Sequence, residues 1–127
     1  MFGIICMEET KKILVVDDDV SILDTLEMVL TYYGYDVAKV SRGDKVFEQI
    51  NQYHPDLILM DIMLAGMDGR VICSAIKSEM EDMPVILISA TESGATCMDR
   101  NGAPDDFVQK PFDVNTLIER IEHQLAA

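Results

Sequence analysis

Several side chains able to take part in chemistry lie directly after short apolar segments of this sequence. Such segments are typical of strands buried on both faces of a parallel sheet. In an open parallel sheet the carboxyl ends of the strands share one edge, and ligands bind there. The polar residues at these ends are Asp17 and Asp18 after Lys12–Val16, Asp61 after Leu57–Met60, Ser89 after Val85–Ile88 and Lys110 after Phe107–Gln109. We therefore expect acids, a hydroxyl and an amine to converge on that edge.

The three carboxylates would place several negative charges in a small space. Like charges at short range raise pKa values unless they are neutralised. Mg²⁺ (or Mn²⁺) can neutralise them, since it prefers oxygen ligands from a few carboxylates, waters and often a phosphate. Ser89 and Lys110 could then contact phosphoryl oxygens, while one carboxylate is left free to attack. This set of residues predicts transfer of a phosphoryl group onto an aspartate.

The segments between the expected strands have the apolar spacing of amphipathic helices. The first helix is expected to be capped by Asp19 and to end at Gly34. A less uniformly apolar strand over Tyr35–Val40 suits an edge of the sheet, and Ser41 is expected to cap the second helix. The third helix is expected to carry one apolar side made of Val71, Ile72, Ala75 and Ile76.

The last third of the chain continues this alternation. The segment from Thr91 to Arg100 fits a helix least well because Thr, Ser and Gly are poor helix formers. Asp113 can cap a final helix. Alternating strands and helices indicate βαβ units with right-handed crossovers. The expected fold class is α/β, with a doubly wound five-stranded parallel sheet flanked by five helices in one domain, 11–127. Residues 1–10 are interpreted as an N-terminal extension outside the fold.

Composition excludes several classes of protein. The chain has 127 residues, enough for one domain with its own core. Its formal net charge of −13 opposes direct binding to nucleic acid or to an anionic membrane surface. Three cysteines without a CxxC motif indicate a reduced, cytoplasmic chain rather than a disulfide framework or zinc site. No apolar run is long enough to span a bilayer.

Four motifs, taken in order, resemble the receiver domain of two-component response regulators, which has the CheY-like fold. The resemblance runs from Lys11 to Leu125 and implies the flavodoxin-like strand order 2-1-3-4-5. The motifs are Val15-Val16-Asp17-Asp18-Asp19, Leu57-Ile58-Leu59-Met60-Asp61 with Gly66-Met67-Asp68-Gly69, Leu87-Ile88-Ser89-Ala90, and Lys110-Pro111-Phe112.

The resemblance implies a role for each acidic residue. Asp61 matches the phosphoacceptor, which receives a phosphoryl group from a histidine kinase or a histidine phosphotransfer protein. Asp17 and Asp18 match the metal-binding acids, with Asp18 the more direct ligand, and the backbone carbonyl of Met63 would be a further ligand. Met63 and Thr91 also match positions that tune the lifetime of the phosphoryl group.

The remaining site residues follow from the same resemblance. Ser89 matches the hydroxyl that moves to meet the phosphoryl oxygen, and Lys110 matches the family's lysine, with a cis bond to Pro111. Phe107 matches the aromatic switch position, although a static place in the core is the alternative. The protein would not be an enzyme beyond catalysing its own phosphorylation and dephosphorylation. It would act by a shift between two conformations.

The resemblance also implies partners. These are a sensor histidine kinase or histidine phosphotransfer protein and a downstream protein target or output domain, with no direct nucleic acid or membrane binding. A homodimer could form through the face carried by residues 91–125.

Two departures from the family pattern concern loops: Ala65 stands where proline is common, and the stretch from Ser89 to Lys110 is one residue shorter than expected.

Two other interpretations compete with a phosphoacceptor. Asp17-x-Asp19-x-Ser21 after an apolar strand is similar to the nucleophile motif of haloacid-dehalogenase-type phosphatases, in which the second aspartate is a general acid. Those enzymes have longer chains and a cap insertion, and this interpretation gives Asp61 no central role. The third interpretation is a non-phosphorylated pseudo-receiver that only binds partners. The complete set of Asp, Asp, Asp, Ser and Lys argues against it.

Overall fold

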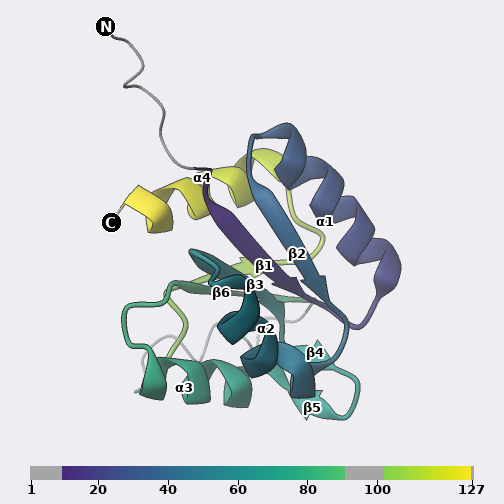
Figure 1. Ribbon diagram of the computed structural model, residues 1–127. Helices are drawn as coiled ribbons and strands as arrows, with labels where there is room; N and C mark the ends of the chain where they lie inside the picture. The colour runs from purple at the N-terminus through teal and green to yellow at the C-terminus, as the bar shows by residue number, and fades with distance from the viewer. Residues whose placement is uncertain (1–9, 91–101, 127) are drawn as a thin grey trace, which may run out of the picture.

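A five-stranded parallel sheet forms the centre of the computed structural model, which describes residues 10–90 and 102–126. The strands run in the order β2-β1-β3-β6-β7, so β3 lies in the middle (Figure 1). This arrangement confirms the expected order 2-1-3-4-5. The strands are β1 (Lys12–Val16), β2 (Asp36–Val40), β3 (Leu57–Asp61), β6 (Val85–Ser89) and β7 (Asp106–Gln109).

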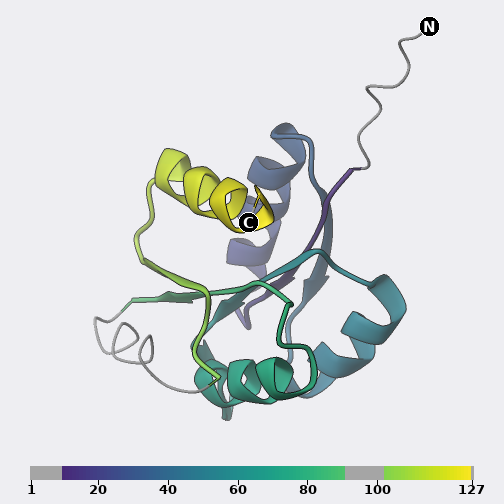
Figure 2. The same cartoon turned by 90° about the vertical axis from the view of Figure 1, so that its left-hand side faces the viewer.

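Helices cover both faces of the sheet. α1 and α4 lie on one face and α2 and α3 on the other, as Figures 1 and 2 show from two directions. The helices of the described part are α1 (Val20–Tyr32), α2 (Val46–Tyr53), α3 (Gly69–Glu79) and α4 (Val114–Ala126), and a short 3₁₀ turn, η2 (Gly43–Lys45), precedes α2. The expected helix from Thr91 to Arg100 and most of the expected N-terminal extension lie outside the described residues. Among the helices that are described, none has the length and hydropathy needed to span a bilayer.

Alternate residues of the central strands pack on opposite faces of the sheet. Ile13 and Val15 of β1 belong to the cluster that contains the inner sides of α1 and α4. Leu14 and Val16 belong to the cluster that contains those of α2 and α3. A strand that contributes to two cores is apolar at every position, which is why these segments lack a polar alternation.

The helix ends follow the sequence signals in most places. Asp19 caps α1 by accepting from the backbone N–H of Ser21 at 2.9 Å, and Gly34 after that helix has a φ of +93°. Asp113 caps α4 by accepting from the N–H of Thr116 at 3.1 Å. The expectation for Ser41 was wrong. The chain forms η2 first, and Gly43 there packs against α3 and the loop before it, so α2 begins only at Val46.

The inner side of α3 also differs from the expectation. Val71 is 67% exposed and Ala75 is exposed, whereas Ile72, Cys73 and Ile76 are buried. The sequence offers two overlapping apolar stripes on this helix. The close contact of Gly69, at the start of α3, with the end of β3 selects the stripe that contains Ile72 and Ile76.

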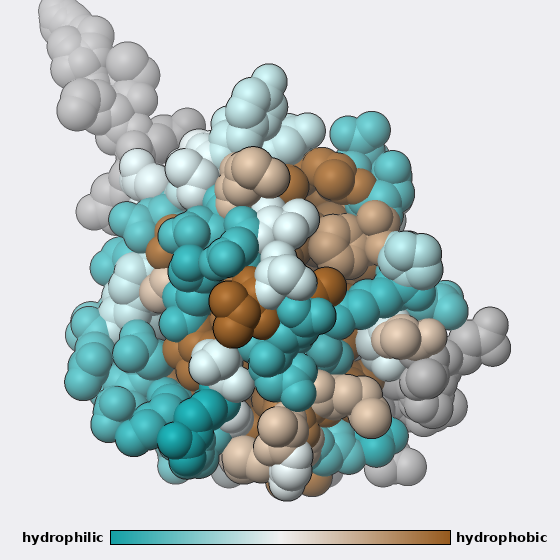
Figure 3. Space-filling model, turned by 90° about the vertical axis from the view of Figure 1, so that its right-hand side faces the viewer, coloured by the Kyte–Doolittle hydropathy of each residue, from teal (hydrophilic) through white to brown (hydrophobic). Residues whose placement is uncertain are grey.

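The loop after Asp61 contains structure that the sequence did not predict. β4 (Met63–Leu64) and β5 (Met67–Asp68) form a two-stranded antiparallel hairpin with Gly66 at its turn, where φ is +73°. Met63 and Met67 are exposed here, and Met28 is exposed on α1, so these methionines do not fill the core. Figure 3 shows polar and apolar areas interleaved over one side of the molecule.

Candidate functional site

Residues from four strand ends meet at the carboxyl edge of the sheet. Asp17 and Asp18 follow β1, Asp61 ends β3 and Ser89 ends β6. Lys110 follows β7, and its backbone N–H donates to the Ser89 carbonyl at 2.7 Å. The parallel order of the strands therefore brings together the five side chains that the sequence singled out.

Three carboxylates form a cluster at this edge, which we call the carboxylate cluster: Asp17, Asp18 and Asp61. Each offers an oxygen, and these oxygens lie within 4.8 Å of one another. Asp17 and Asp61 are buried, whereas Asp18 is exposed. The carboxylate of Asp18 is therefore accessible to solvent, whereas those of Asp17 and Asp61 are buried.

Lys110 bridges the two buried carboxylates. Its Nζ lies 2.8 Å from Asp61 Oδ2 and 3.1 Å from Asp17 Oδ2. The lysine side chain is itself mostly buried, with 19% exposed. A cation shared between two like charges offsets the repulsion that would otherwise separate them. Sequence reasoning assigned Lys110 to the phosphoryl group and did not foresee this bridge.

Burial and neighbouring charges shift the pKa values of this group. Burial is the largest influence on Asp17 and, together with the charge of Asp61, it raises the pKa of Asp17 above its ordinary value. A hydrogen bond from the Asp19 N–H and the contact with Lys110 act in the opposite direction without reversing the shift. For Lys110, burial alone would lower the pKa, but the bonds to Asp61 and Asp17 outweigh it and raise the pKa.

The backbone around the site fixes both buried carboxylates. Asp17 Oδ1 accepts from the N–H of Asp19 at 2.9 Å, and Asp61 Oδ1 accepts from the N–H of Met63 at 3.1 Å. In each carboxylate, one oxygen thus accepts a hydrogen bond from a backbone N–H and the other accepts one from Lys110. Asp61 ends a strand whose five residues are all buried, which leaves its position little freedom.

The other expected site residues lie close to this edge in different settings. Ser89 is 1% exposed, and the peptide bond between Lys110 and Pro111 is cis. Phe107 is half-buried and packs against the core cluster shared with α2 and α3. The side chain of Met63 is 69% exposed. Thr91 lies outside the described residues.

Asp19 does not join the carboxylate cluster. Its Oδ1 accepts from the backbone N–H of Ser21 at 2.9 Å and from the Ser21 hydroxyl at 2.7 Å. These bonds lower the pKa of Asp19 and hold it as a carboxylate at the start of α1. A general acid must hold a proton at the start of its reaction and reach the reacting group. The phosphatase interpretation, which gives that role to Asp19, is therefore not favoured.

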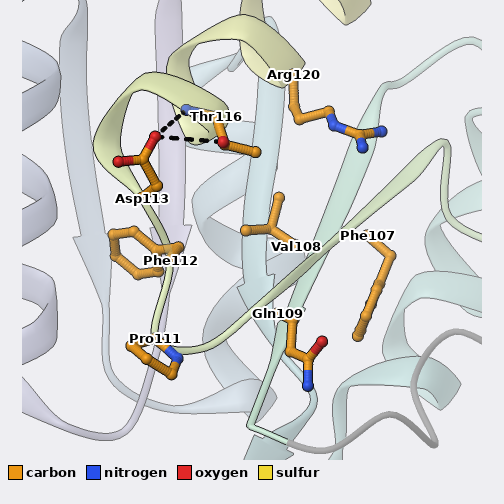
Figure 4. Close-up of a pocket in the computed structure, with 8 residues that line it drawn as sticks. All are labelled: Phe107, Val108, Gln109, Pro111, Phe112, Asp113, Thr116 and Arg120. Carbon is orange, nitrogen blue, oxygen red and sulfur yellow. Dashed lines mark hydrogen bonds between the residues drawn. The ribbon is translucent and has the colours of Figure 1, made fainter.

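A separate hollow of about 460 Å³ lies between β7 and the start of α4 (Figure 4). Phe107, Phe112 and Arg120 line it, and Lys110 of the carboxyl edge does not. Arg120 donates to Asp106 at 2.9 Å, and the carboxylate of Asp106 is buried. None of the three residues of the carboxylate cluster lines this hollow.

Gly69 is the site-adjacent residue that sequence reasoning did not identify as functional. A Cβ atom added there would overlap the carbonyl oxygen of Asp61 and lie 2.9 Å from Ile62 Cα. The sequence signal for Gly69 was its place in Gly66-Met67-Asp68-Gly69, one of the motifs that carry the family resemblance.

Comparison with known proteins places most of the chain in one family. A family model described as the response regulator receiver domain matches residues 13–122. Two similar proteins are the DNA-binding response regulators MtrA of Mycolicibacterium paratuberculosis and of Mycolicibacterium smegmatis, 32% and 33% identical over 116 residues. The alignment covers 91% of this chain but only 51% and 50% of theirs, so the chain spans about half the length of these relatives.

Solved structures show the same fold. A response regulator from Chloroflexus aurantiacus is 27% identical with a TM-score of 0.85, covering 94% of this chain and 100% of that chain. The receiver domain of NtrX from Brucella abortus is 32% identical with a TM-score of 0.83, covering 91% and 98%. TrrA from Thermotoga maritima, solved in complex with Mg²⁺-BeF, is 28% identical with a TM-score of 0.83, covering 91% and 99%. This chain belongs to the response regulator receiver domain family and is a signalling domain of two-component systems.

Proposed function

We propose that Asp61 accepts a phosphoryl group from a sensor histidine kinase or a histidine phosphotransfer protein. The observation that supports this most directly is the pairing of a buried Asp61 with Lys110 inside the carboxylate cluster. In the proposed reaction the P–N bond of a phosphohistidine breaks while an Asp61 oxygen bonds to phosphorus. The leaving imidazole nitrogen takes up a proton.

The carboxylate cluster has the chemistry of a hard-cation site. Mg²⁺ and Mn²⁺ prefer oxygen ligands, and the oxygens of Asp17, Asp18 and Asp61 lie within 4.8 Å of one another. We infer that these three residues, together with the backbone carbonyl of Met63, would hold Mg²⁺ (or Mn²⁺). The bound ion would supply positive charge for the phosphoryl oxygens during transfer.

The chain's own residues would orient and neutralise the incoming group. Lys110 already contacts the acceptor carboxylate and would offer its remaining N–H donors to a phosphoryl oxygen. Ser89, buried at the end of β6, would donate its hydroxyl to another oxygen. The N–H of Met63 would hold one oxygen of Asp61 while the other reacts. These contacts are mostly positioning, which is what phosphoryl transfer requires.

Phosphorylation would act as a switch by shifting the population between two conformations. Ser89 would move toward the phosphoryl oxygen, and Phe107, half-buried beside the core, would follow. The phosphoaspartate would also be hydrolysed within the same site, so that the domain catalyses its own dephosphorylation. We infer that the protein receives its phosphoryl group in the cytoplasm.

The proposed partners follow from the receiver domain and not from whole relatives. The MtrA proteins are named as DNA-binding, but the aligned region covers about half of each. We assign this chain a phosphodonor and a downstream protein target or output domain, and no nucleic acid contact of its own. The net charge of −13 supports that assignment. A homodimer through residues 91–125 is a further part of the proposal, although 91–101 of this range lie outside the described residues.

Intact mass measurement after incubation with acetyl phosphate and Mg²⁺ tests the proposal. We expect the wild-type chain to gain one phosphoryl group, and the gain should be absent from Asp61→Asn and from samples treated with EDTA. Asp56→Asn is a matched control at the other end of β3, where the Asp56 carboxylate accepts from the Lys12 N–H at 2.8 Å, away from the carboxyl edge. This variant should be phosphorylated.

Each competing interpretation predicts a different result. A phosphatase that uses Asp17 would hydrolyse a phosphomonoester and lose activity in Asp17→Asn, with little change in Asp61→Asn. A binding module would neither gain mass nor form a complex with beryllofluoride. Phosphorylation of Asp61→Asn to the same extent as wild type would contradict the assignment of Asp61.

A further inference from the structure

The start of α3 lies directly against the end of β3. Gly69 is the first residue of α3, and its N–H donates to the carbonyl of Ile62 at 2.7 Å. A Cβ atom on residue 69 would overlap the Asp61 carbonyl oxygen and lie 2.9 Å from Ile62 Cα. These neighbours are backbone atoms of a buried strand end, so they cannot move aside as a flexible side chain could.

A short hydrogen-bond chain connects this contact to the phosphoacceptor side chain. The Ile62 carbonyl accepts a hydrogen bond from the Gly69 N–H. The Ile62 N–H donates a hydrogen bond to the Ile88 carbonyl on β6 at 3.0 Å. The next residue, Met63, donates its N–H to Asp61 Oδ1 at 3.1 Å. Displacement of Ile62 would therefore change the position of the Met63 N–H and of the Asp61 carboxylate together.

The hairpin that joins β3 to α3 is supported from a second side. Its two strands pair Met63 with Asp68 and Leu64 with Met67. Behind it lies Gly43 of η2, where an added Cβ would lie 2.9 Å from the Met67 sulfur. This pairing and packing order the loop although Ala65 occupies the position where proline is common in the family.

We propose that Gly69 is a positioning residue for the phosphoacceptor site. By lacking a side chain it lets α3 lie against the backbone of Asp61 and Ile62, and this contact fixes the Asp61 carboxylate and the Met63 backbone. The proposal rests on the function proposed above. It predicts that Gly69 controls metal affinity and phosphorylation rate beyond its effect on stability.

Two glycine variants separate this role from a general loss of stability. Gly69→Ala introduces the overlap with the Asp61 backbone. Gly66→Ala lies in the same hairpin, where φ is +73° and, apart from its two chain neighbours, no heavy atom of the described residues lies within 4 Å of the added Cβ. Gly66→Ala should therefore lose stability through backbone strain alone. For both variants we would measure the urea midpoint, the Mg²⁺ dissociation constant by calorimetry, and the rate of phosphorylation by acetyl phosphate.

In Gly69→Ala we expect Mg²⁺ affinity and phosphorylation rate each to fall about tenfold or more, as is common when residues supporting metal ligands are changed. In Gly66→Ala both should stay within about twofold of wild type, because the added Cβ does not contact the backbone of Asp61 or Ile62. Wild-type affinity and rate in a destabilised Gly69→Ala would overturn the positioning role while leaving Asp61 as the phosphoacceptor. Failure of the wild-type chain to gain a phosphoryl group would refute the proposed function and, with it, this inference.

Hydrogen exchange of the wild-type chain provides a test if Gly69→Ala does not fold. The proposal requires the Gly69 amide to be protected to the same degree as the amides of β3, since both belong to one fixed unit. Exchange of the Gly69 amide at the rate of an exposed loop amide would overturn it.

Discussion

Replacement of Lys110 by methionine would remove the cation that lies between two buried carboxylates. The Nζ of Lys110 lies 2.8 Å from Asp61 Oδ2 and 3.1 Å from Asp17 Oδ2. Methionine keeps much of the length of the side chain and removes its charge. In the variant the two carboxylates would face each other without compensation, and folding would become less favourable at neutral pH.

The size of the effect follows from these distances and from burial. Two unit charges about 3 Å apart attract by roughly 5 kcal/mol at an effective dielectric constant of about 20. Desolvation of the ions offsets much of this energy, and breaking a buried pair usually costs about 3–5 kcal/mol. Because 19% of the Lys110 side chain is exposed, solvent screening reduces the effect. We expect a loss of about 2 kcal/mol in the free energy of unfolding at pH 7.

The loss should depend on pH in a defined direction. Burial already raises the pKa of Asp17 above 3.8, and loss of Lys110 would raise it further. The folded variant would then bind protons more readily than the unfolded chain, so the difference from wild type shrinks as the pH falls toward that pKa. The pKa of Lys110 is raised above 10.5, so its contribution is complete below 10.5 and is lost only at higher pH.

Urea denaturation in EDTA between pH 4.5 and pH 7.5 measures this difference. Lys39→Met is the matched control, because Lys39 Nζ also contacts two carboxylates, those of Asp24 at 3.0 Å and Glu27 at 2.9 Å. The side chains of these partners are 61% and 43% exposed, far more than those of Asp17 and Asp61, so the control should change stability little at any pH. Equal urea midpoints for Lys110→Met and wild type at pH 7 would refute the reasoning.

Three further substitutions test other parts of the fold by urea denaturation. Asp68→Ala removes the cap of α3 and should cost about 1 kcal/mol at pH 7. Because a hydrogen bond from Arg70 lowers the pKa of Asp68, this cost should disappear as the pH falls below 3.8, and a constant cost would contradict the assignment. Arg120→Met leaves the Asp106 carboxylate buried without its arginine and should cost about 1–2 kcal/mol, with recovery in the double variant with Asp106→Asn. Gly34→Ala should cost about 1 kcal/mol through its φ of +93° alone, and a larger loss would indicate a contact that the structure does not show.

The sheet and the position of the site could be predicted because each depends on short-range signals. Continuous apolar segments such as Leu57–Met60 can bury all their side chains only in a sheet that is covered on both faces. In a parallel sheet, the polar residues that follow such strands then share the carboxyl edge. The predicted N-terminal caps of α1 and α4 were confirmed for a similar reason. Asp19 and Asp113 each accept a hydrogen bond from a residue two or three positions further along the chain.

The features that the sequence did not predict depend on contacts between distant segments. The β4–β5 hairpin pairs only Met63–Leu64 with Met67–Asp68, which is too short for a periodic pattern. The start of α2 depends on how Gly43 packs against Ile72, and the buried side of α3 depends on Gly69. The bridge from Lys110 to Asp17 joins residues 93 positions apart. The roles of the site residues remain predictions that the experiments above can test.

The placement of Asp61 on β3 has a mechanical consequence. All five residues of this strand are buried, and its neighbours β1 and β6 hold it by parallel pairing on both sides. A change of charge at Asp61 therefore acts on a strand that is held by packing and by pairing on both sides. Crystal structures of the two charge states should superpose closely on the sheet. Apart from the side chains of Ser89 and Phe107, their differences should appear in the connecting segments at the carboxyl edge, where a partner can bind.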